Sequence, residues 1–211
     1  DAGLRVETAR RMWGSRTDLA SDMSGELLPA LRYFMPKAKK TDEAYPEGEG
    51  VLLGSEGFLT FAGLVQQLGG DAVRAREVVD HLVVRGILRR GLILGCSQCE
   101  RPSFIGVDVV GQRTRCPRCG ADNELVQARW KKPEDGEPTW FYDLHPVLRE
   151  LLGQRGEYPL ILSNYLRTKA RRYDDVAELE LITPSEERAA EADLIAMCDD
   201  EIVVAEVKSS N

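Results

Sequence analysis

The sequence predicts a multidomain protein of the α+β or α/β class. Three observations support this class: two helical segments joined by a glycine turn, two close pairs of cysteines, and two apolar runs near the C-terminus that suit the central strands of a sheet. With 43% hydrophobic and 30% charged residues, the 211-residue chain has enough apolar side chains for a sizeable core and enough charge for a polar surface.

Residues 1–50 are predicted to contain helices followed by a linker. Apolar side chains recur at helical spacing between Gly25 and Phe34. Residues 36–50 are polar and contain two prolines and two glycines, a composition typical of an exposed loop. The first domain boundary is therefore expected at the end of this stretch.

The next segment has the pattern of two helices followed by strands. Thr60 is expected to cap a helix that extends through Leu68, and a second helix is expected from residue 72 to residue 85. Two glycines separate them. Residues 87–94 are predicted to form two short strands about a turn at Gly91.

This order of elements across residues 51–91 resembles the winged-helix fold. The resemblance implies a DNA-binding second helix, with Arg74 and Arg76 near its start as candidate contacts. A small helical module that contacts only other proteins has the same pattern. Both interpretations stay open.

Four of the five cysteines form two Cys-x-x-Cys pairs separated by sixteen residues. Each turn directs two thiolates toward one point, so Cys96, Cys99, Cys116 and Cys119 can complete a tetrahedron around Zn²⁺. Four protein ligands leave no position for water, which predicts a structural and not a catalytic metal. Residues 92–130 thus resemble a zinc ribbon. One interpretation is a purely structural role, in which the ribbon supports a neighbouring domain. Alternatively, its arginines also contact nucleic acid.

The C-terminal apolar runs carry three chemically active side chains. Asp193 lies in the first run, and Glu206 and Lys208 lie in the second. Because side chains alternate across a strand, Glu206 and Lys208 are expected on one face. A turn at Asp199 and Asp200 would bring Asp193 beside them. Two carboxylates would then share a divalent cation next to an ammonium group.

On these residues, the segment 140–211 resembles the PD-(D/E)xK nuclease superfamily, which has the restriction-endonuclease-like fold. The resemblance implies that Asp193 and Glu206 bind Mg²⁺ or Mn²⁺, assisted by the backbone oxygen of Val207. It also implies that Lys208 orients or activates the attacking water. A cation polarises the scissile phosphate and lowers the pKa of bound water, and an ammonium group offsets charge in the transition state.

The motif match covers residues 178–210 and departs from the family pattern in three respects. Ala192 stands where the family has the proline that names the motif. The helix predicted at residues 160–172 lacks the glutamate that the family often has, and Glu178 or Glu180 is the candidate substitute. The family core also has a helix and a strand after the lysine. The segment 140–211 is therefore expected to contain only the first part of the family's mixed sheet. The nuclease-like domain is expected to be truncated at its C-terminus.

A basic segment precedes this site. Its four cationic side chains have no acidic residue among them and are Arg167, Lys169, Arg171 and Arg172. On a helix they can contact phosphates, and such contacts would give salt-dependent affinity. A solvated helix face is the equally open alternative.

Charge and hydropathy set limits on the function. The net charge is −7, and residues 160–211 hold twelve acidic against six basic side chains, which argues against nucleic-acid binding over the whole surface. The sequence shows no apolar run of about 18 residues and no signal peptide, so a cytoplasmic protein without a membrane partner is expected.

The sequence therefore predicts a metal-dependent DNA endonuclease. Such a mixture of modules suits restriction or anti-phage defence, with DNA and other subunits of a nuclease or defence complex as partners. The alternative is a non-catalytic DNA-binding or adaptor protein with a degenerate nuclease-like domain.

Overall fold

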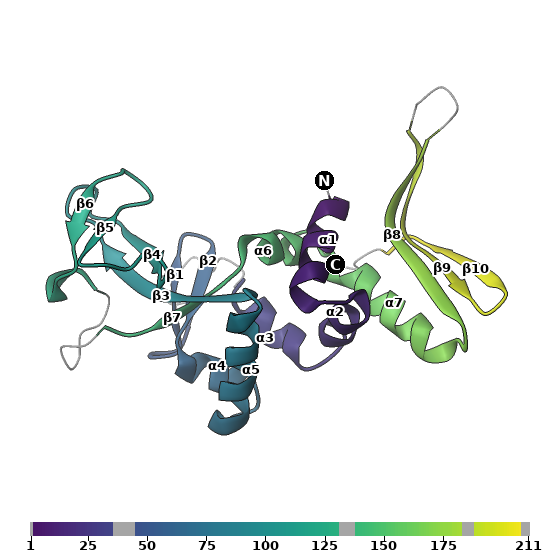
Figure 1. Ribbon diagram of the computed structural model, residues 1–211, viewed down its shortest axis with the longest axis horizontal. Coiled ribbons are helices and arrows are strands. Elements are labelled where there is room, and N and C mark those ends of the chain that lie inside the picture. Colours follow the sequence, from purple (N-terminus) through teal and green to yellow (C-terminus); the bar gives the residue numbers. More distant parts are fainter. Residues whose placement is uncertain (1, 36–44, 131–137, 183–187, 208–211) are drawn as a thin grey trace. The chain divides into compact units, whose positions relative to one another are not determined.

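The structure is a computed structural model that describes residues 2–35, 45–130, 138–182 and 188–207. The chain divides into two compact units, which are described separately (Figure 1). Unit 1 combines residues 1–28 with residues 146–211, and unit 2 consists of residues 29–145. Both contain helices and antiparallel sheets, so the predicted mixed class is confirmed. No helix in the described ranges combines the length and apolar character that a membrane crossing requires.

Unit 2 is built on a five-stranded antiparallel sheet with the strand order β1-β2-β7-β3-β4 (Figure 1). The strands are β1 (Gly50–Leu53), β2 (Glu56–Leu59), β3 (Leu88–Gly95), β4 (Pro102–Gly106) and β7 (Phe141–Leu144). Phe58, Ile93 and Phe141 form a buried cluster on this sheet. Phe104 stacks on Phe58 with ring centroids 5.3 Å apart, so aromatic contacts link the edge strands to the centre.

The helices of unit 2 confirm the predicted cap at Thr60 and have a second cap at Asp71. α4 (Phe61–Gln67) begins after Thr60, whose hydroxyl accepts a hydrogen bond from the Gly63 amide. α5 (Ala72–Val84) begins after Asp71, whose carboxylate accepts from two backbone amides. The predicted helix around Gly25–Phe34 is α3 (Leu27–Tyr33). Most of the predicted linker lies at residues 36–44, outside the described residues.

The prediction of two short strands with a turn at Gly91 is wrong. Gly91 lies inside the continuous strand β3 and pairs with Gly106 on β4 and Phe141 on β7. A Cβ atom at Gly91 would lie 2.2 Å from the carbonyl oxygen of Ile105. The glycine therefore permits a close approach of two strands, not a turn. The hairpin that follows α5 is formed instead by the whole of β3 and by β4, and its connection carries Cys96 and Cys99.

The sequence also suggests Asp143 as the cap of a helix that begins near Pro146, but Asp143 lies within a strand. Asp143 is buried in β7 and forms an ion pair with Arg89 on β3. The helix that follows, α6 (Pro146–Gly153), begins with proline as predicted. A buried carboxylate needs a charged partner, and Arg89 supplies it across the strand pair.

Two short strands and a 3-10 turn complete unit 2. They are β5 (Arg113–Arg115), β6 (Asp122–Glu124) and η1 (Gln127–Arg129), and β5 pairs with β6. A separate apolar cluster of Leu92, Leu94 and Ile105 supports this end of β3 and β4. Trp130 packs on the cluster and forms a β-bridge with Leu94. The segment predicted as a ribbon is thus anchored on the main sheet.

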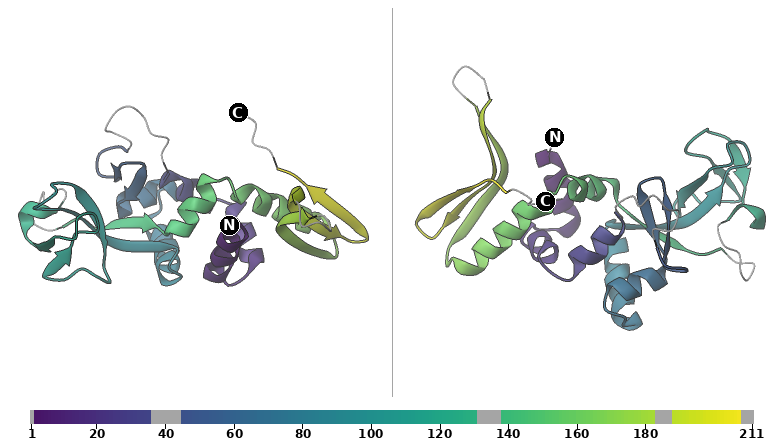
Figure 2. Two further views of the ribbon diagram at one scale, coloured as in Figure 1. Left: turned by 90° about the horizontal axis from the view of Figure 1, so that it is seen from above. Right: turned by 180° about the vertical axis from the view of Figure 1, so that it is seen from behind.

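Unit 1 contains a three-stranded antiparallel sheet with the order β10-β9-β8. The strands are β8 (Tyr173–Ile182), β9 (Arg188–Cys198) and β10 (Glu201–Ala205). Helix α7 (Glu157–Lys169) packs against β8 and β9, and Figure 2 shows the sheet and the helix from two further sides. Ala192, Leu194 and Ala196 are buried, so alternate residues of β9 face the core.

The N-terminal helices belong to unit 1. α1 (Ala2–Trp13) contacts α6, and α2 (Arg16–Met23) contacts α7. Arg16 forms an ion pair of 3.0 Å with Asp175 on β8. The linear division expected from the sequence thus differs from the spatial grouping, in which residues 1–28 pack with the C-terminal part.

The close approach at Gly91 predicts that alanine substitution at two glycines of β3 has different effects on the free energy of unfolding. Gly91→Ala should destabilise the protein by about 1–3 kcal/mol, because its Cβ overlaps the Ile105 carbonyl. Gly95→Ala is the matched control, because its Cβ would meet the Arg129 carbonyl oxygen at an ordinary 3.5 Å. Urea unfolding of both variants measures the difference. Equal midpoints would contradict the packing argument.

Candidate functional site

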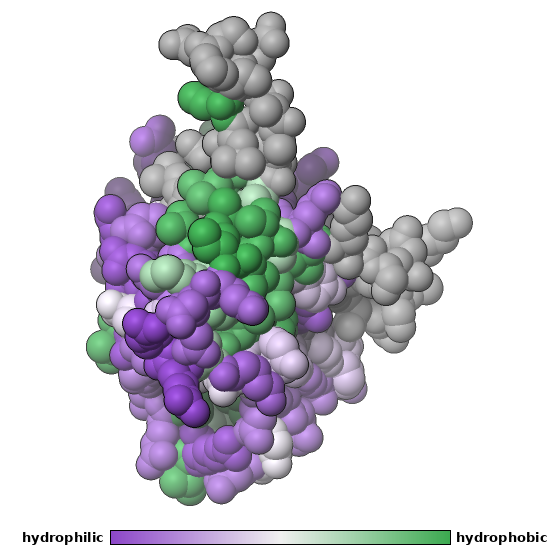
Figure 3. Space-filling model, turned by 90° about the vertical axis from the view of Figure 1, so that its right-hand side faces the viewer, coloured by the Kyte–Doolittle hydropathy of each residue, from purple (hydrophilic) through white to green (hydrophobic). Residues whose placement is uncertain are grey.

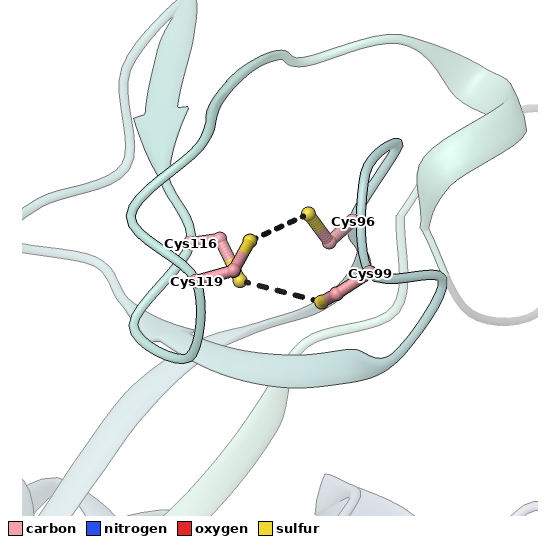
Figure 4. Close-up of side chains that lie close together, drawn as sticks. All are labelled: Cys96, Cys99, Cys116 and Cys119. Atoms are coloured by element: carbon pink, nitrogen blue, oxygen red, sulfur yellow. Dashed lines mark hydrogen bonds between the residues drawn. The ribbon is translucent and has the colours of Figure 1, made fainter.

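The four paired cysteines converge on one point of unit 2 (Figure 4). Their sulfur atoms all lie within 4.8 Å of one another. The Sγ atoms of Cys96 and Cys119 are 3.6 Å apart, and those of Cys99 and Cys116 are 3.9 Å apart. A tetrahedral site with Zn–S bonds of about 2.3 Å requires sulfur atoms about 3.8 Å apart. The thiols are free and are positioned to bind a metal ion, in an arrangement consistent with structural zinc.

Two tight turns position these sulfurs. Cys96 follows β3 and Cys99 precedes β4, whereas Cys116 and Cys119 lie in the turn between β5 and β6. Each turn is closed by a backbone hydrogen bond: the Glu100 amide donates to the Cys96 carbonyl, and the Gly120 amide donates to the Cys116 carbonyl. Gly120 has φ +74°, a left-handed conformation that glycine adopts without strain.

The electrostatics of the cluster favour thiolates at the first cysteine of each pair. The backbone amides of Cys99 and Gln98 lower the pKa of Cys96 to about 6. The amides of Cys119 and Arg118 likewise lower the pKa of Cys116. The Ala121 amide lowers the pKa of Cys119, but burial and the neighbouring thiols outweigh it and raise that pKa to about 11. Four neighbouring thiolates would repel one another. A bound cation would offset this repulsion and stabilise all four thiolates together.

Asn123 forms hydrogen bonds to both cysteine turns. This residue was not identified from the sequence. Its amide nitrogen lies 3.7 Å from Cys96 Sγ and donates to the Ala121 carbonyl at 2.9 Å. Its amide oxygen accepts from the Ser97 amide and hydroxyl at 2.9 and 3.0 Å, and it also accepts from Arg129. The side chain is buried. Asn123 therefore links the two cysteine turns, a role that sequence spacing alone does not reveal.

The carboxylate site lies on the sheet of unit 1. The predicted turn at Asp199–Asp200 is present, and Asp199 Oδ1 accepts from the amides of Arg171 and Arg172, each at 2.9 Å. Ala205 pairs with Leu194, and the next register position places Glu206 opposite Asp193. The Val207 amide donates to Asp193 Oδ2 at 2.6 Å.

Asp193 is partly buried and Glu206 is exposed. The Val207 backbone thus contacts Asp193, and Glu206 directly follows the end of β10. Lys208 lies outside the described residues. Among the residues that were described, no group of three His, Cys, Asp or Glu side chains with metal-binding spacing includes Asp193; the four cysteines form the one such group.

The helix that precedes β8 does carry a glutamate. α7 begins at Glu157, three residues before the predicted start at Leu160. Glu157 is completely buried in the first turn, and Pro159 is accommodated there. The predicted helix began after Pro159 and therefore excluded Glu157. Glu178 occupies the register position opposite Asp193 on β8 and Glu180 pairs with Glu191, but the side chains of Glu178 and Glu180 lie outside what the structure describes.

Both predicted nucleic-acid contacts on α5, Arg74 and Arg76, are exposed. The Arg76 guanidinium lies 3.6 Å from the centroid of the Phe61 ring and donates to the Tyr142 hydroxyl at 3.4 Å. Arg76 thus packs within unit 2.

The basic segment lies at the end of α7. Arg167 donates to Asn164, and Lys169 lies over the Tyr165 ring at 5.6 Å. Arg172 pairs with Asp200 at 2.7 Å, and the side chain of Arg171 is exposed. These four residues belong to unit 1, whereas Arg74 belongs to unit 2.

Comparison with known proteins yields no assignment. The chain matches no protein-family model, and neither curated proteins nor solved structures give a significant match. The functional argument therefore rests on the geometry of the two sites.

The outer hydrogen bonds of the cysteine cluster predict the effect of a single substitution. Asn123→Ala should weaken zinc binding by about 10- to 100-fold, because it removes the amide that orients Cys96 and Ser97. Competition with a chromogenic chelator measures the affinity. Gln127→Ala, at an exposed position near the cluster, is the control and should bind zinc like the unmodified protein. Equal affinities of the two variants would refute the role of Asn123.

Proposed function

We propose that the protein is a metal-dependent nuclease that hydrolyses phosphodiester bonds in DNA at Asp193 and Glu206. The observation that carries this proposal is the 2.6 Å hydrogen bond from the Val207 amide to Asp193 Oδ2. It holds the end of the second strand against the carboxylate of the first. The strand order β8-β9-β10, with helix α7 directly before β8, is also the arrangement expected from the resemblance to the PD-(D/E)xK superfamily.

The carboxylate pair fits a hard divalent cation. Asp193 lies on β9, and Glu206 directly follows the neighbouring strand β10, so their like charges repel each other. One carboxylate oxygen of Asp193 accepts from Val207, so the other oxygen is available as a ligand. Mg²⁺ commonly takes one or two carboxylates and completes its octahedron with water and substrate oxygens. Mn²⁺ uses the same oxygen ligands.

Each residue has a separate proposed role. Asp193 and Glu206 hold the cation, and the carbonyl of Val207 is the third protein ligand. Lys208 orients the attacking water and offsets the negative charge that develops on the phosphate. When bound, the cation supplies Lewis-acid polarisation of the phosphate and lowers the pKa of the water.

The upstream modules are proposed to hold or select the substrate. We assign the cysteine centre to structural zinc in a ribbon-like segment, because its closed thiolate set leaves no position for water. The pair α4 and α5 is proposed as a winged-helix-like module, with Arg74 as its candidate phosphate contact. Phosphate contacts by Arg167, Lys169, Arg171 and Arg172 would bring DNA to unit 1. A role in restriction or anti-phage defence, with further subunits, is part of this proposal.

A non-catalytic DNA-binding or adaptor protein is the second candidate. One observation favours it: among the side chains that the structure describes, which exclude those of Glu178 and Glu180, no group of three possible metal ligands includes Asp193 or Glu206. In that case the nuclease-like sheet would serve as a scaffold.

Substitution of the carboxylates separates the two candidates. Glu206→Gln should reduce Mg²⁺-dependent cleavage of DNA by about 100-fold or more, because it removes a charge that holds the cation. Cleavage of a labelled duplex with Mg²⁺ or Mn²⁺ gives the rate, and circular dichroism checks the fold. The matched control is Glu201→Gln, an exposed glutamate of the same unit on β10, which should cleave normally.

Two outcomes would contradict catalysis at this site. If both variants cleave at the same rate as the unmodified protein, the activity belongs to other residues. If the unmodified protein binds DNA but does not cleave it with either cation, the second candidate is correct. Binding should weaken steeply with salt in both cases, since phosphate contacts release counterions.

A further inference from the structure

One face of the β8-β9-β10 sheet exposes an apolar surface. α7 and the buried residues of β9 occupy the opposite face, so alternate side chains of all three strands point to this one. It carries five aliphatic side chains, which we call the apolar face: Val176, Ile195, Met197, Ile202 and Val204. Figure 3 shows apolar residues gathered on this side of the molecule, with hydrophilic residues beside them.

The strand register makes the apolar face continuous. Ile195 is paired with Val176 on one side and Val204 on the other, and this forms one row across the sheet. Met197 and Ile202 form the next row. Neighbouring side chains in such rows lie about 5 Å apart. Exposed fractions of 51% for Val176, 53% for Met197, 74% for Ile202 and 62% for Val204 show how much of this surface is uncovered.

Acidic side chains lie at both ends of the apolar face. Asp174 is paired with Met197 at one end, and Asp193 and Glu206 occupy the row at the other end. Unit 1 as a whole has 19 acidic and 12 basic side chains, whereas unit 2 has 16 of each. The entire net charge of the chain therefore resides in the unit that carries the apolar face.

We propose that the apolar face binds an amphipathic helix of a partner protein, with an aliphatic stripe flanked by lysine or arginine. A sheet face is commonly covered by a helix layer. Three strands spaced about 4.8 Å apart give a width of roughly 10 Å, which matches the diameter of one helix. Basic flanks complement Asp174 at one end and Asp193 and Glu206 at the other.

The charges argue against a second copy of this chain as the occupant. In a symmetric pair, the same face meets itself, so acidic ends of one copy would approach those of the other. Like charges in a partly desolvated interface cost free energy unless a cation or a proton neutralises them. A basic partner removes this cost and uses the same carboxylates. This inference does not depend on nuclease activity.

Designed peptides test the inference on the full chain. The probe is a fluorescent helical peptide of about 18 residues with a leucine stripe and lysine flanks. Two comparison peptides have the same stripe with glutamate flanks, or the same leucine and lysine content in scrambled order. Fluorescence anisotropy should show binding of the striped lysine peptide at least about tenfold tighter than of either comparison peptide.

Matched valine variants locate the binding site. Val204→Ser on the apolar face should weaken binding of the striped lysine peptide by about tenfold, because it removes buried aliphatic area. Val84→Ser should leave binding unchanged, since Val84 is 87% exposed on α5 of unit 2. Both substitutions are at exposed positions, and circular dichroism verifies the fold.

Three results would overturn the inference. The first is equal binding of the striped and scrambled lysine peptides, which would indicate charge attraction without an apolar face. The second is no binding of any peptide by the unmodified protein. The third is concentration-dependent dimerisation in analytical ultracentrifugation that Val204→Ser abolishes, which would identify a second copy as the occupant. Weakened peptide binding by Val204→Ser with unchanged cleavage of DNA separates this inference from the proposed nuclease function.

Discussion

The alternating burial of β9 is the constraint on which unit 1 depends. Ala192, Leu194 and Ala196 point into the core, and the residues between them point away from it. Because the side-chain period of a strand is two, a slip of one residue would place the Asp193 carboxylate in the apolar core and expose three apolar side chains. The same register therefore fixes the carboxylate pair and the apolar face together.

The two candidate metal sites follow opposite physical rules. The cysteine cluster is enclosed by tight turns, and its amides and Asn123 orient the soft sulfur ligands. The carboxylate pair lies on a partly exposed sheet face, where the Val207 amide orients Asp193. A closed thiolate set suits a structural ion, whereas an open oxygen set leaves coordination positions for water and substrate.

Short sequence patterns predicted most of the features that depend on neighbouring residues. The cap at Thr60, the spacing of the cysteines and the turn at Asp199 each depend on a few neighbouring residues, and the structure contains them. Gly91 was misread because glycine marks both turns and close strand contacts, and only the position of Ile105 distinguishes them. Likewise, the packing of residues 1–28 against α6 and α7 depends on side chains distant in sequence. No local pattern contains that information.

The discontinuity of unit 1 has a consequence for synthesis on the ribosome. Trp13, Leu19 and Met23 are buried in the folded chain, yet the helices α6 and α7 that α1 and α2 contact are translated only after all of unit 2. Unit 2 is contiguous in sequence and can fold as it leaves the ribosome. The apolar faces of α1 and α2 remain uncovered until α6 and α7 have been synthesised. Vectorial folding therefore favours completion of the cysteine-containing unit before the sheet that carries the carboxylates. A nascent chain held at that stage would be a natural substrate for chaperones.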